Sequence, residues 1–368
     1  MRLLICAGGT GGGVYPALSV LQAVGNRAEA VLWVGGEGGM EADLIARHHI
    51  AYQSIPAAGV HGVGLASLPG NLIKLARGMF ASRRILREFK PDVLLFTGGY
   101  VAVPMAVAAT RFNSLLYVPD IEPGLALKSL AKYSDVIALT ADESHKYFNL
   151  KKRMVVTGYP IRSDLTVWNR QDALKEMHLT ADMPVILVIG GSKGAHLINQ
   201  AVLPQLPAIL KKAQVLHVTG QADYQEALKI KSLLPAAMAE RYHPHAYLHN
   251  EIGAAFASAD LAISRAGAST LGELPMFELP AILVPYPFAW RYQHVNAEYL
   301  VAHGAAEIIE NDVLEERLVP AVDRLLSDPV ALSTMRSAMK VLAIPQAARN
   351  IADLVVELGT QVERGGNQ

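Results

Sequence analysis

Three glycine-rich segments are the clearest chemical feature of this sequence. They occupy residues 8–13, 190–195 and 264–270, and each follows a short apolar run and precedes a helical pattern. Backbone N–H groups at a helix start attract anions, and glycine lets a ligand approach the backbone closely. We therefore expect phosphate-binding loops. The candidate residues are Thr10, Gly11, Gly12 and Gly13 in the first segment, Gly191, Ser192, Lys193 and Gly194 in the second, and Gly267, Ala268 and Ser269 in the third.

The two later segments favour a nucleoside diphosphate as the ligand. Ser192 and Lys193 add a hydroxyl and a cation to the second segment, and both suit a diphosphate. The third segment precedes a helix that carries Glu273, where a carboxylate can accept two hydrogen bonds from a ribose diol. A glutamate in the first turns of a helix is also a common surface residue, because the helix dipole favours negative charge there. Its position beside the glycines favours the ligand-binding interpretation.

The first segment fits neither of two common phosphate motifs. Val14 occupies the last glycine position of the dinucleotide-binding pattern, and no Lys-Ser or Lys-Thr pair completes a P-loop. A dinucleotide or ATP site is therefore disfavoured. The segment still has the outline of an anion site, because it precedes Pro16, which suits the first turn of a helix over 17–24. The alternative is a tight turn that only packs the helix on its strand.

Candidate catalytic groups lie in the first half of the chain. Asp120 and Glu122 follow the apolar run 115–118, on the edge where α/β sheets bind ligands. Either carboxylate could be the base that activates an acceptor hydroxyl. The alternative is that they cap a helix beginning near Pro123. Tyr100 follows two glycines and either orients an acceptor or packs at a helix start.

Metal and cofactor chemistry is not expected. The chain lacks an Asp-x-Asp motif, and its nearest pattern is the segment 120–122. Helix N-termini and a cation can stabilise the charge on a departing diphosphate without a metal. We therefore expect no obligatory metal or other cofactor. His61, on a predicted loop, is a third candidate base, although a solvated loop histidine is the commoner case.

The elements that must position these residues alternate regularly. Short β-branched runs are separated by longer helical patterns, which is typical of parallel strands joined by right-handed crossovers. The length of 368 residues suits two domains. We predict an α/β fold with two doubly wound, Rossmann-like domains over 1–160 and 161–343, and a C-terminal helix in 344–368 that packs back on the first. The predicted strands are 3–6, 30–34, 92–96, 115–118 and 136–139, then 185–189, 215–218, 261–264 and 281–284.

Composition excludes several classes of partner. Lysine plus arginine equals aspartate plus glutamate at 33 each, so no overall field attracts nucleic acid. The only cysteine, Cys6, lies in an apolar run, which favours a reducing compartment. The start of the chain does not resemble a signal peptide, and no apolar run is long enough to cross a bilayer. We expect a soluble, cytoplasmic protein.

Seven segments together carry a family pattern: Gly-Gly-Thr-Gly-Gly at 8–12, Lys-Pro-Asp at 90–92, Gly-Gly-Tyr-Val at 98–101, Thr-Gly-Tyr-Pro-Ile-Arg at 157–162, Gly-Gly-Ser-Lys-Gly-Ala at 190–195, Ser-Arg-Ala-Gly-Ala at 264–268 with Glu273, and Arg-Tyr-Gln-His-Val-Asn-Ala at 291–297. They resemble glycosyltransferase family 28 over nearly the whole chain. The resemblance implies the GT-B architecture, with two Rossmann-like domains facing a cleft and a UDP-sugar held by the C-terminal one. It further implies that Arg162 and the second segment address the diphosphate and that Glu273 binds the ribose. The sugar contacts are assigned to Gln293 and Asn296.

The activity implied by the resemblance is inverting transfer of a sugar from a UDP-sugar to a hydroxyl acceptor. In such enzymes the sugar is N-acetylglucosamine and the acceptor is linked to a polyprenyl or other lipid. The acceptor side departs from the family pattern. Gly13 stands where the family has a histidine, and residues 117–120 replace a His-Glu-Gln-Asn motif. The acceptor and the catalytic base therefore stay open.

The segment 71–90 is basic and amphipathic. In the family this region is associated with docking on an anionic membrane, which would place the protein on the inner face of the cell membrane. The alternative is a sheet-packing helix with a solvated basic side. The basic residues are Lys74, Arg77, Arg83, Arg84, Arg87 and Lys90.

Two other functions stay open. A UDP-N-acetylglucosamine 2-epimerase uses the same fold and donor, but it needs carboxylates and histidines around the sugar for proton transfer. A UDP-sugar-binding protein that has lost turnover is the second alternative, and the altered residues 13 and 117–120 motivate it.

Overall fold

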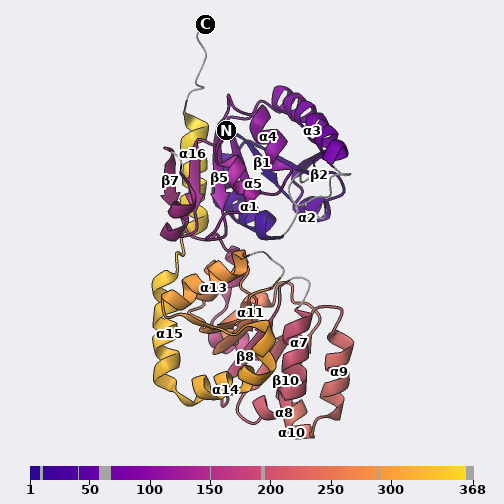
Figure 1. Ribbon diagram of the computed structural model, residues 1–368, viewed down its shortest axis with the longest axis vertical. Helices are drawn as coiled ribbons and strands as arrows, with labels where there is room; N and C mark the ends of the chain where they lie inside the picture. The colour runs from indigo at the N-terminus through magenta and orange to yellow at the C-terminus, as the bar shows by residue number, and fades with distance from the viewer. Residues whose placement is uncertain are drawn as a thin grey trace. The chain divides into compact units, whose positions relative to one another are not determined.

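Two compact α/β units make up the protein, shown in Figure 1 as a computed structural model. The first comprises Met1–Ile161 with Pro345–Gln368, and the second comprises Arg162–Ile344. The chain thus leaves the first unit, forms the second and returns. The structure describes residues 1–8, 11–39, 41–57, 68–149, 151–191, 195–287 and 291–361.

The first unit is built on a parallel sheet. Its strands, among the described residues, are β1 (Arg2–Ala7), β2 (Ala30–Gly36), β3 (Ala51–Ile55), β4 (Val93–Gly98), β5 (Asn113–Val118), β6 (Val136–Leu139) and β7 (Arg153–Val156). They pair in the order β3-β2-β1-β4-β5-β6-β7. The order reverses between β1 and β4, and ligands of α/β sheets bind at such a point, outside the carboxyl ends of the strands. The first glycine segment follows β1, so it lies at that point.

The second unit repeats this plan. Its strands, within the described ranges, are β8 (Val185–Ile189), β9 (Gln214–Val218), β10 (Tyr242–His245), β11 (Leu261–Ser264), β12 (Ala281–Leu283) and β13 (Ala306–Ile308). They are parallel, in the order β10-β9-β8-β11-β12-β13. The order reverses between β8 and β11, the strands that lead into the second and third glycine segments. The sheet therefore brings those two segments to one edge.

Helices connect the strands and cover both sheets. In the first unit they include α1 (Gly11–Val24), α2 (Glu41–Arg47), α3 (Leu68–Phe89), α4 (Ala102–Ala108), α5 (Leu125–Leu130) and α16 (Ala347–Thr360). In the second they include α6 (Arg170–Glu176), α7 (His196–Val202), α8 (Leu206–Ile209), α9 (Tyr224–Leu233), α10 (Ala236–Ala239), α11 (Ile252–Ser258), α12 (Thr270–Met276), α13 (Tyr292–Ala302), α14 (Leu314–Ser327) and α15 (Pro329–Leu342).

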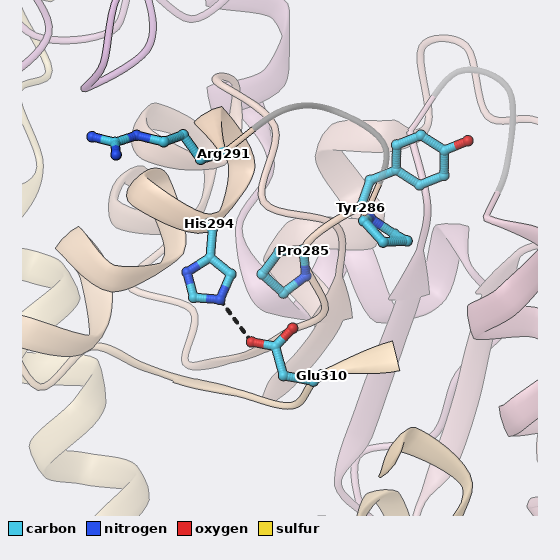
Figure 2. A pocket seen from close by; sticks show the side chains of 6 residues that line it. Pro285, Tyr286, Arg291, His294 and Glu310 are labelled. Carbon is cyan, nitrogen blue, oxygen red and sulfur yellow. Dashed lines mark hydrogen bonds and ion pairs between the residues drawn. The ribbon is translucent and has the colours of Figure 1, made fainter. Parts of the chain in front are cut away.

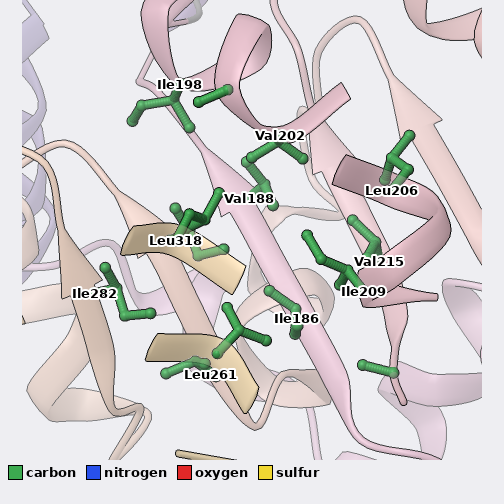
Figure 3. Close-up of a cluster of buried hydrophobic side chains, with 14 of the residues drawn as sticks. Ile186, Val188, Ile198, Val202, Leu206, Ile209, Val215, Leu261, Ile282 and Leu318 are labelled. Atoms are coloured by element: carbon green, nitrogen blue, oxygen red, sulfur yellow. The ribbon is translucent and has the colours of Figure 1, made fainter. Parts of the chain in front are cut away.

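Apolar side chains on both faces of the central strands form the cores. In the second unit, Ile186 and Val188 of β8 are fully or almost fully buried. Figure 3 shows them between side chains that come from neighbouring strands and from helices. Helices cover both faces of a parallel sheet, which explains why its central strands read as continuous apolar runs. The surrounding side chains include Ile198, Val202, Leu206, Ile209, Val215, Leu261, Ile282 and Leu318.

The last helix belongs to the first unit. α16 packs against α1, β4 and β5. Arg27 holds Asp353 at 2.7 Å (Nη1 to Oδ1), and Arg153 forms an ion pair with Glu357. The apolar face of the helix is buried, with Ile351 and its neighbours inside. Residues at both ends of the chain therefore complete one unit.

The predicted fold class is confirmed, since each unit is a doubly wound, Rossmann-like α/β layer structure. Every predicted strand coincides with an observed one, although 92–96 begins one residue before β4 and 281–284 ends one residue after β12. Four observed strands were not predicted, and they are β3, β7, β10 and β13, the edge strands of the two sheets.

Candidate donor and acceptor sites

The third glycine segment is a tight turn between β11 and α12. The Thr270 hydroxyl donates to the Gly267 carbonyl at 2.6 Å, and the Thr270 backbone N–H donates to the same oxygen at 3.0 Å. Gly267, Ala268 and Ser269 are only partly buried. Open space lies where a Gly267 side chain would be. The turn therefore offers accessible backbone at a helix start, which suits a phosphate group.

Glu273 lies in the first turn of α12 and is partly buried. Burial raises the pKa of its carboxyl above the usual range, although a hydrogen bond with Ser269 and the charge of Arg162 both act to lower that pKa. The Arg162 guanidinium also faces Asp164, at 3.6 Å from Nε to Oδ1. The structure thus brings together three of the predicted donor residues, Arg162, Ser269 and Glu273.

Only the start of the second glycine segment is described. Gly191 has a φ of 87°, a left-handed backbone conformation that favours glycine, and open space lies where its side chain would be. Ser192, Lys193 and Gly194 lie outside the described residues, so their diphosphate role stays a prediction. The segment leads into α7, whose first residue is His196.

A polar network fixes the start of α7. His196 Nδ1 lies 2.9 Å from Asp223 Oδ1, and Asp223 Oδ2 accepts a hydrogen bond from Asn199 at 2.6 Å. The Asn199 oxygen faces His217 Nε2 at 2.9 Å, and His217 Nδ1 faces the Tyr242 hydroxyl at 3.0 Å. Burial lowers the pKa of His217 to about 3, so its ring is neutral at physiological pH. The network anchors the helix that follows the second glycine segment.

Gln293 and Asn296 lie on α13, which begins beside the third glycine segment. The Gln293 side-chain oxygen accepts a hydrogen bond from the Tyr286 N–H at 2.9 Å. Asn296 is fully buried and donates to the Ala266 carbonyl at 3.1 Å. In this structure Asn296 therefore ties α13 to the glycine turn from inside. A direct contact of either amide with the sugar stays a prediction.

A pocket of about 220 Å³ opens next to Gln293. Figure 2 shows the His294 ring turned toward Glu310, with 2.7 Å between His294 Nε2 and Glu310 Oε1, while the Arg291 side chain extends away from this pair. The pocket combines an apolar wall with charged groups, which suits a polar ligand such as a sugar. Its lining residues are Pro285, Tyr286, Pro287, Arg291, His294 and Glu310.

Arg265 is a residue of this region that sequence reasoning missed. Although it is an arginine it is only 7% exposed, and its guanidinium donates to the Val284 carbonyl at 2.9 Å and to Asn311 Oδ1 at 2.7 Å. It also lies over the Tyr286 ring, 5.4 Å from the centroid. Arg265 therefore joins the third glycine segment to the wall of the pocket. An arginine directly after an apolar strand and before a glycine turn was the available signal.

The first glycine segment lies partly within a helix. The predicted helix over 17–24 is confirmed as part of α1, but α1 begins earlier, at Gly11, so Pro16 lies inside the helix and its predicted place in the first turn is wrong. Pro16 cannot donate to the Gly12 carbonyl, but Gly12 is exposed and water can hydrate that oxygen. Gly11, Gly12 and Gly13 form the first turn of α1. Thr10 lies outside the described residues.

Gly13 is a point of close packing. The Thr97 hydroxyl donates to the Gly13 carbonyl at 2.6 Å, and a β-carbon at Gly13 would lie 3.3 Å from the Thr97 carbonyl oxygen. A side chain here would push α1 away from the end of β4. The packing alternative therefore has a structural basis at Gly13, while an anion-binding role for Thr10, Gly11 and Gly12 stays a prediction.

Gly99 approaches the first glycine segment directly. Its φ is 85°, and a β-carbon at this position would lie 2.5 Å from the Gly8 carbonyl oxygen. Only glycine satisfies both conditions. Tyr100 follows and is 48% exposed, so its ring is available to an acceptor. The turn before α4 and the turn after β1 therefore form one surface of the first unit.

The two candidate bases differ in their surroundings. Glu122 is buried, with 3.5 Å between its Oε1 and Lys128 Nζ, whereas Asp120 is partly exposed at the end of β5. α5 begins at Leu125, and Gly124, which has no side chain, stands at its N-cap position. The alternative that Asp120 or Glu122 caps a helix beginning near Pro123 stays a prediction.

The altered segment 117–120 is partly a packing element. Tyr117 is fully buried, its hydroxyl lies 2.8 Å from the Thr140 hydroxyl, and its ring meets Tyr159 edge to face at 6.4 Å. Burial raises the pKa of Tyr117 well above its usual range, so the phenol stays protonated. Tyr117 is therefore unsuited to act as a base.

Among the described residues, no group of three or more His, Cys, Asp or Glu side chains is placed to hold a metal ion. This bears on the described ranges alone, and the expectation that no metal is needed stays a prediction. His61, the third candidate base, lies outside those ranges.

Two Rossmann-like units, with glycine turns at the switch point of each sheet, define the class of this protein by fold as GT-B. The profile of the glycosyltransferase family 28 N-terminal domain matches residues 3–139, and that of the family 28 C-terminal domain matches residues 185–353. The chain belongs to glycosyltransferase family 28.

Relatives and solved structures agree with this assignment. A protein of Roseiflexus sp. (strain RS-1), named UDP-N-acetylglucosamine--N-acetylmuramyl-(pentapeptide) pyrophosphoryl-undecaprenol N-acetylglucosamine transferase, is 36% identical over 97% of this chain and 95% of its own. The crystal structure of MurG from Acinetobacter baumannii has a TM-score of 0.78 and 25% identity, covering 97% of this chain and 99% of that one. The UDP-GlcNAc 2-epimerase of Neisseria meningitidis, with a TM-score of 0.67 and 13% identity over 97% of this chain and all of its own, shares the fold.

Proposed function

We propose that this protein transfers N-acetylglucosamine from UDP-N-acetylglucosamine to a hydroxyl of a lipid-linked acceptor, with inversion at the anomeric carbon. The grouping of Arg162, Ser269 and Glu273 beside the open backbone of Gly267 carries the proposal. A cation and free backbone suit a diphosphate, and a carboxylate suits a ribose diol. The activity in the name of the Roseiflexus relative supports the choice of donor and of a lipid-linked acceptor.

Departure of UDP requires stabilisation of the negative charge that develops on the diphosphate. We assign this task to Arg162 and to backbone N–H groups of the second and third glycine segments. Lys193 adds a second cation. With these groups the reaction needs no metal ion and no organic cofactor, so activity should survive a chelator.

Inversion follows from a single in-line attack by the acceptor hydroxyl, assisted by a base within hydrogen-bond reach. Asp120 is the stronger candidate, because its carboxylate is partly exposed. Glu122 is the weaker one, because it is buried against Lys128. The exposed ring of Tyr100 is placed to orient the acceptor in the same unit.

Contact with an anionic membrane would bring the protein to such an acceptor. On α3, Ile73 is 61% exposed and Phe80 is 69% exposed, seven residues apart on one face of the helix. Arg77, Arg84 and the other basic residues of the helix are also exposed. An exposed apolar and basic face of this kind suits a surface of anionic lipid. None of the described helices combines the length and apolar character that crossing a bilayer requires. We propose that the protein works in the cytoplasm, at the inner face of the cell membrane.

A transfer assay tests the proposal. Purified protein is incubated with UDP-[14C]N-acetylglucosamine and undecaprenyl-pyrophosphoryl-N-acetylmuramyl-pentapeptide in detergent, with and without EDTA. We expect labelled lipid and UDP in equal amounts, a β-linked product by NMR, and no effect of EDTA. Asp120→Asn should abolish transfer while UDP binding persists. Retained transfer in both Asp120→Asn and Glu122→Gln would remove both carboxylates as the base.

Two outcomes of the same assay would favour the other functions. Release of UDP and N-acetylmannosamine without an acceptor would indicate an epimerase. UDP binding with no turnover, on this and on other lipid-linked acceptors, would indicate a binding protein.

A further inference from the structure

A buried carboxylate lies at the carboxyl edge of the first sheet, outside the residues assigned so far. Glu41 is the first residue of α2 and is only 2% exposed. Its Oε1 accepts a hydrogen bond from the Gly36 N–H at 2.8 Å. A buried carboxylate is costly unless nearby groups hydrogen-bond to it. The groups around Glu41 should therefore explain why a carboxylate is buried at this position.

Three glycines surround this carboxylate too closely for any side chain. A β-carbon at each of them would lie 2.8 Å or less from Glu41 Oε1, and real β-carbons essentially never approach an atom to within 3.0 Å. At Gly36, by contrast, the same distance would be 3.8 Å, which is an ordinary contact. Glu41 therefore occupies the space beside Gly8 and Gly39, and at Gly35 it shares that space with the Tyr52 hydroxyl, which would lie 2.3 Å from a β-carbon there. The glycines are Gly8 at 2.4 Å, Gly35 at 2.8 Å and Gly39 at 2.3 Å.

Two neutral side chains, Tyr52 and Cys6, also lie close to Glu41. The Tyr52 hydroxyl donates to the Gly36 carbonyl at 3.4 Å, and burial and the charge of Glu41 raise the pKa of Tyr52 to about 12. Burial and, to a lesser extent, Glu41 also raise the pKa of the Cys6 thiol. Both groups stay protonated at physiological pH, so they add no negative charge beside Glu41.

Gly8 connects this cluster to the acceptor side of the unit. Gly8 begins the first glycine segment and touches the Glu41 carboxylate on one side. On another side its carbonyl lies against Gly99, the residue before the exposed Tyr100. Glu41, Gly8 and Gly99 therefore form one continuous packed layer at the switch point of the sheet.

We propose that Glu41 is a positioning residue for the acceptor, whose carboxylate holds the first glycine segment and, through Gly8, the turn at Gly99 in the shape that acceptor binding requires. This inference rests on the proposed function. A carboxylate suits the task because both of its oxygens accept hydrogen bonds, whereas a glutamine keeps one acceptor oxygen and replaces the other with an amide group that donates. Glu41 acts through the two turns and contacts no substrate.

Two substitutions test this role in different ways. Glu41→Gln removes the charge and keeps the size of the side chain. Gly39→Ala keeps the charge but places a β-carbon where the carboxylate now lies, so the carboxylate must move. Each has a matched control in the same turn: Glu37→Gln changes an exposed glutamate, and Gly36→Ala adds a β-carbon at an ordinary contact distance.

The readouts separate positioning from general destabilisation. We expect Glu41→Gln and Gly39→Ala each to lower kcat/KM for the acceptor by about tenfold or more, because small displacements of binding groups have large effects on rate. KM for the donor and the Kd of UDP should stay within about twofold of wild type, as should every parameter of both controls. Unchanged acceptor kinetics in both test variants would overturn the inference.

Hydrogen exchange gives a readout that does not depend on activity. In Glu41→Gln and Gly39→Ala, amides of residues 8–13 and 98–100 should exchange faster, while those of the second unit keep their protection. Unchanged exchange in the two turns would also overturn the inference. A wild-type protein that transfers no sugar would instead contradict the proposed function, and the exchange data would still decide whether Glu41 orders the turns.

Discussion

Replacing Glu273 by glutamine removes a charge at the start of α12 and keeps the size of the side chain. Burial raises the pKa of this carboxyl, which means that the folded protein disfavours its charged form. The charge therefore costs stability increasingly as pH rises from the unfolded-state pKa to the higher folded-state pKa, and the full cost is present above the latter. We expect Glu273→Gln to raise the Tm of the unliganded protein at neutral pH and to leave it unchanged in acid.

The same substitution should weaken the binding of UDP. A hydrogen bond to a charged partner contributes about 1.5–3 kcal/mol, and glutamine keeps an acceptor oxygen but loses the charge. A loss of this size corresponds to a rise in Kd of roughly 10- to 150-fold. A misfolded variant would bind UDP more weakly and would also have a lower Tm. Glu273→Gln is instead expected to combine weaker UDP binding with a higher Tm of the unliganded protein.

Calorimetric titration with UDP and with 2′-deoxy-UDP measures the effect. The loss of affinity caused by Glu273→Gln should be smaller for 2′-deoxy-UDP, because that ligand lacks one of the two hydroxyls that would donate a hydrogen bond to Glu273. Glu226→Gln is the matched control, since Glu226 is an exposed glutamate in the first turn of α9. An unchanged Kd, or an equal loss for both ligands, would refute the assignment of Glu273 to the ribose.

Three further predictions concern Glu273, Gly99 and Phe80. Because ribose hydroxyls would stabilise the charged form of Glu273, the affinity of wild type for UDP-N-acetylglucosamine should rise with pH up to the raised pKa and then level off, while Glu273→Gln should show no such dependence by calorimetry. Gly99→Ala should lower the free energy of unfolding by at least about 2 kcal/mol in urea titrations, because its φ is 85° and Gly8 blocks a β-carbon, whereas Gly70→Ala on α3 should be neutral or mildly stabilising. Phe80→Ser should weaken sedimentation with anionic vesicles by about tenfold without changing the Kd of UDP, and Leu233→Ser on α9, also exposed, should leave both unchanged.

The central strands were predictable and the edge strands were not. Runs such as 185–189 are buried on nearly their whole length, so they read as continuous apolar segments. The edge strand β3 exposes three of its five residues, and β10 is the sequence Tyr-His-Pro-His. An edge strand needs only one paired side, so its residues carry a weaker pattern. Their place in the sheet depends on the neighbours that they pair with.

The candidate donor residues came from two signals: Ser269 and Glu273 stand in or beside a glycine turn, whereas Arg162, Gln293 and Asn296 were named by the family resemblance. What the sequence could not show is how they are held. Asn296 has the same spacing whether it faces a ligand or the core, and only the fold reveals its hydrogen bond to Ala266. Glu41 and Gly8 are 33 residues apart and meet because β1 and β2 are neighbours, which no local pattern indicates. Proline at position 16 suits the first turn of a helix, so the sequence predicts a start for α1 that is later than the observed one at Gly11.

The return of α16 to the first unit has a consequence for synthesis on the ribosome. Residues 162–344 form an uninterrupted unit, so their contacts can all form soon after that stretch has emerged. The earlier unit is completed later, because Ala347–Thr360 covers α1, β4 and β5 and is made only after the whole of the second unit. Until then the apolar surface beneath that helix faces water or a chaperone. The half of the protein that is translated first is therefore the half that finishes folding last.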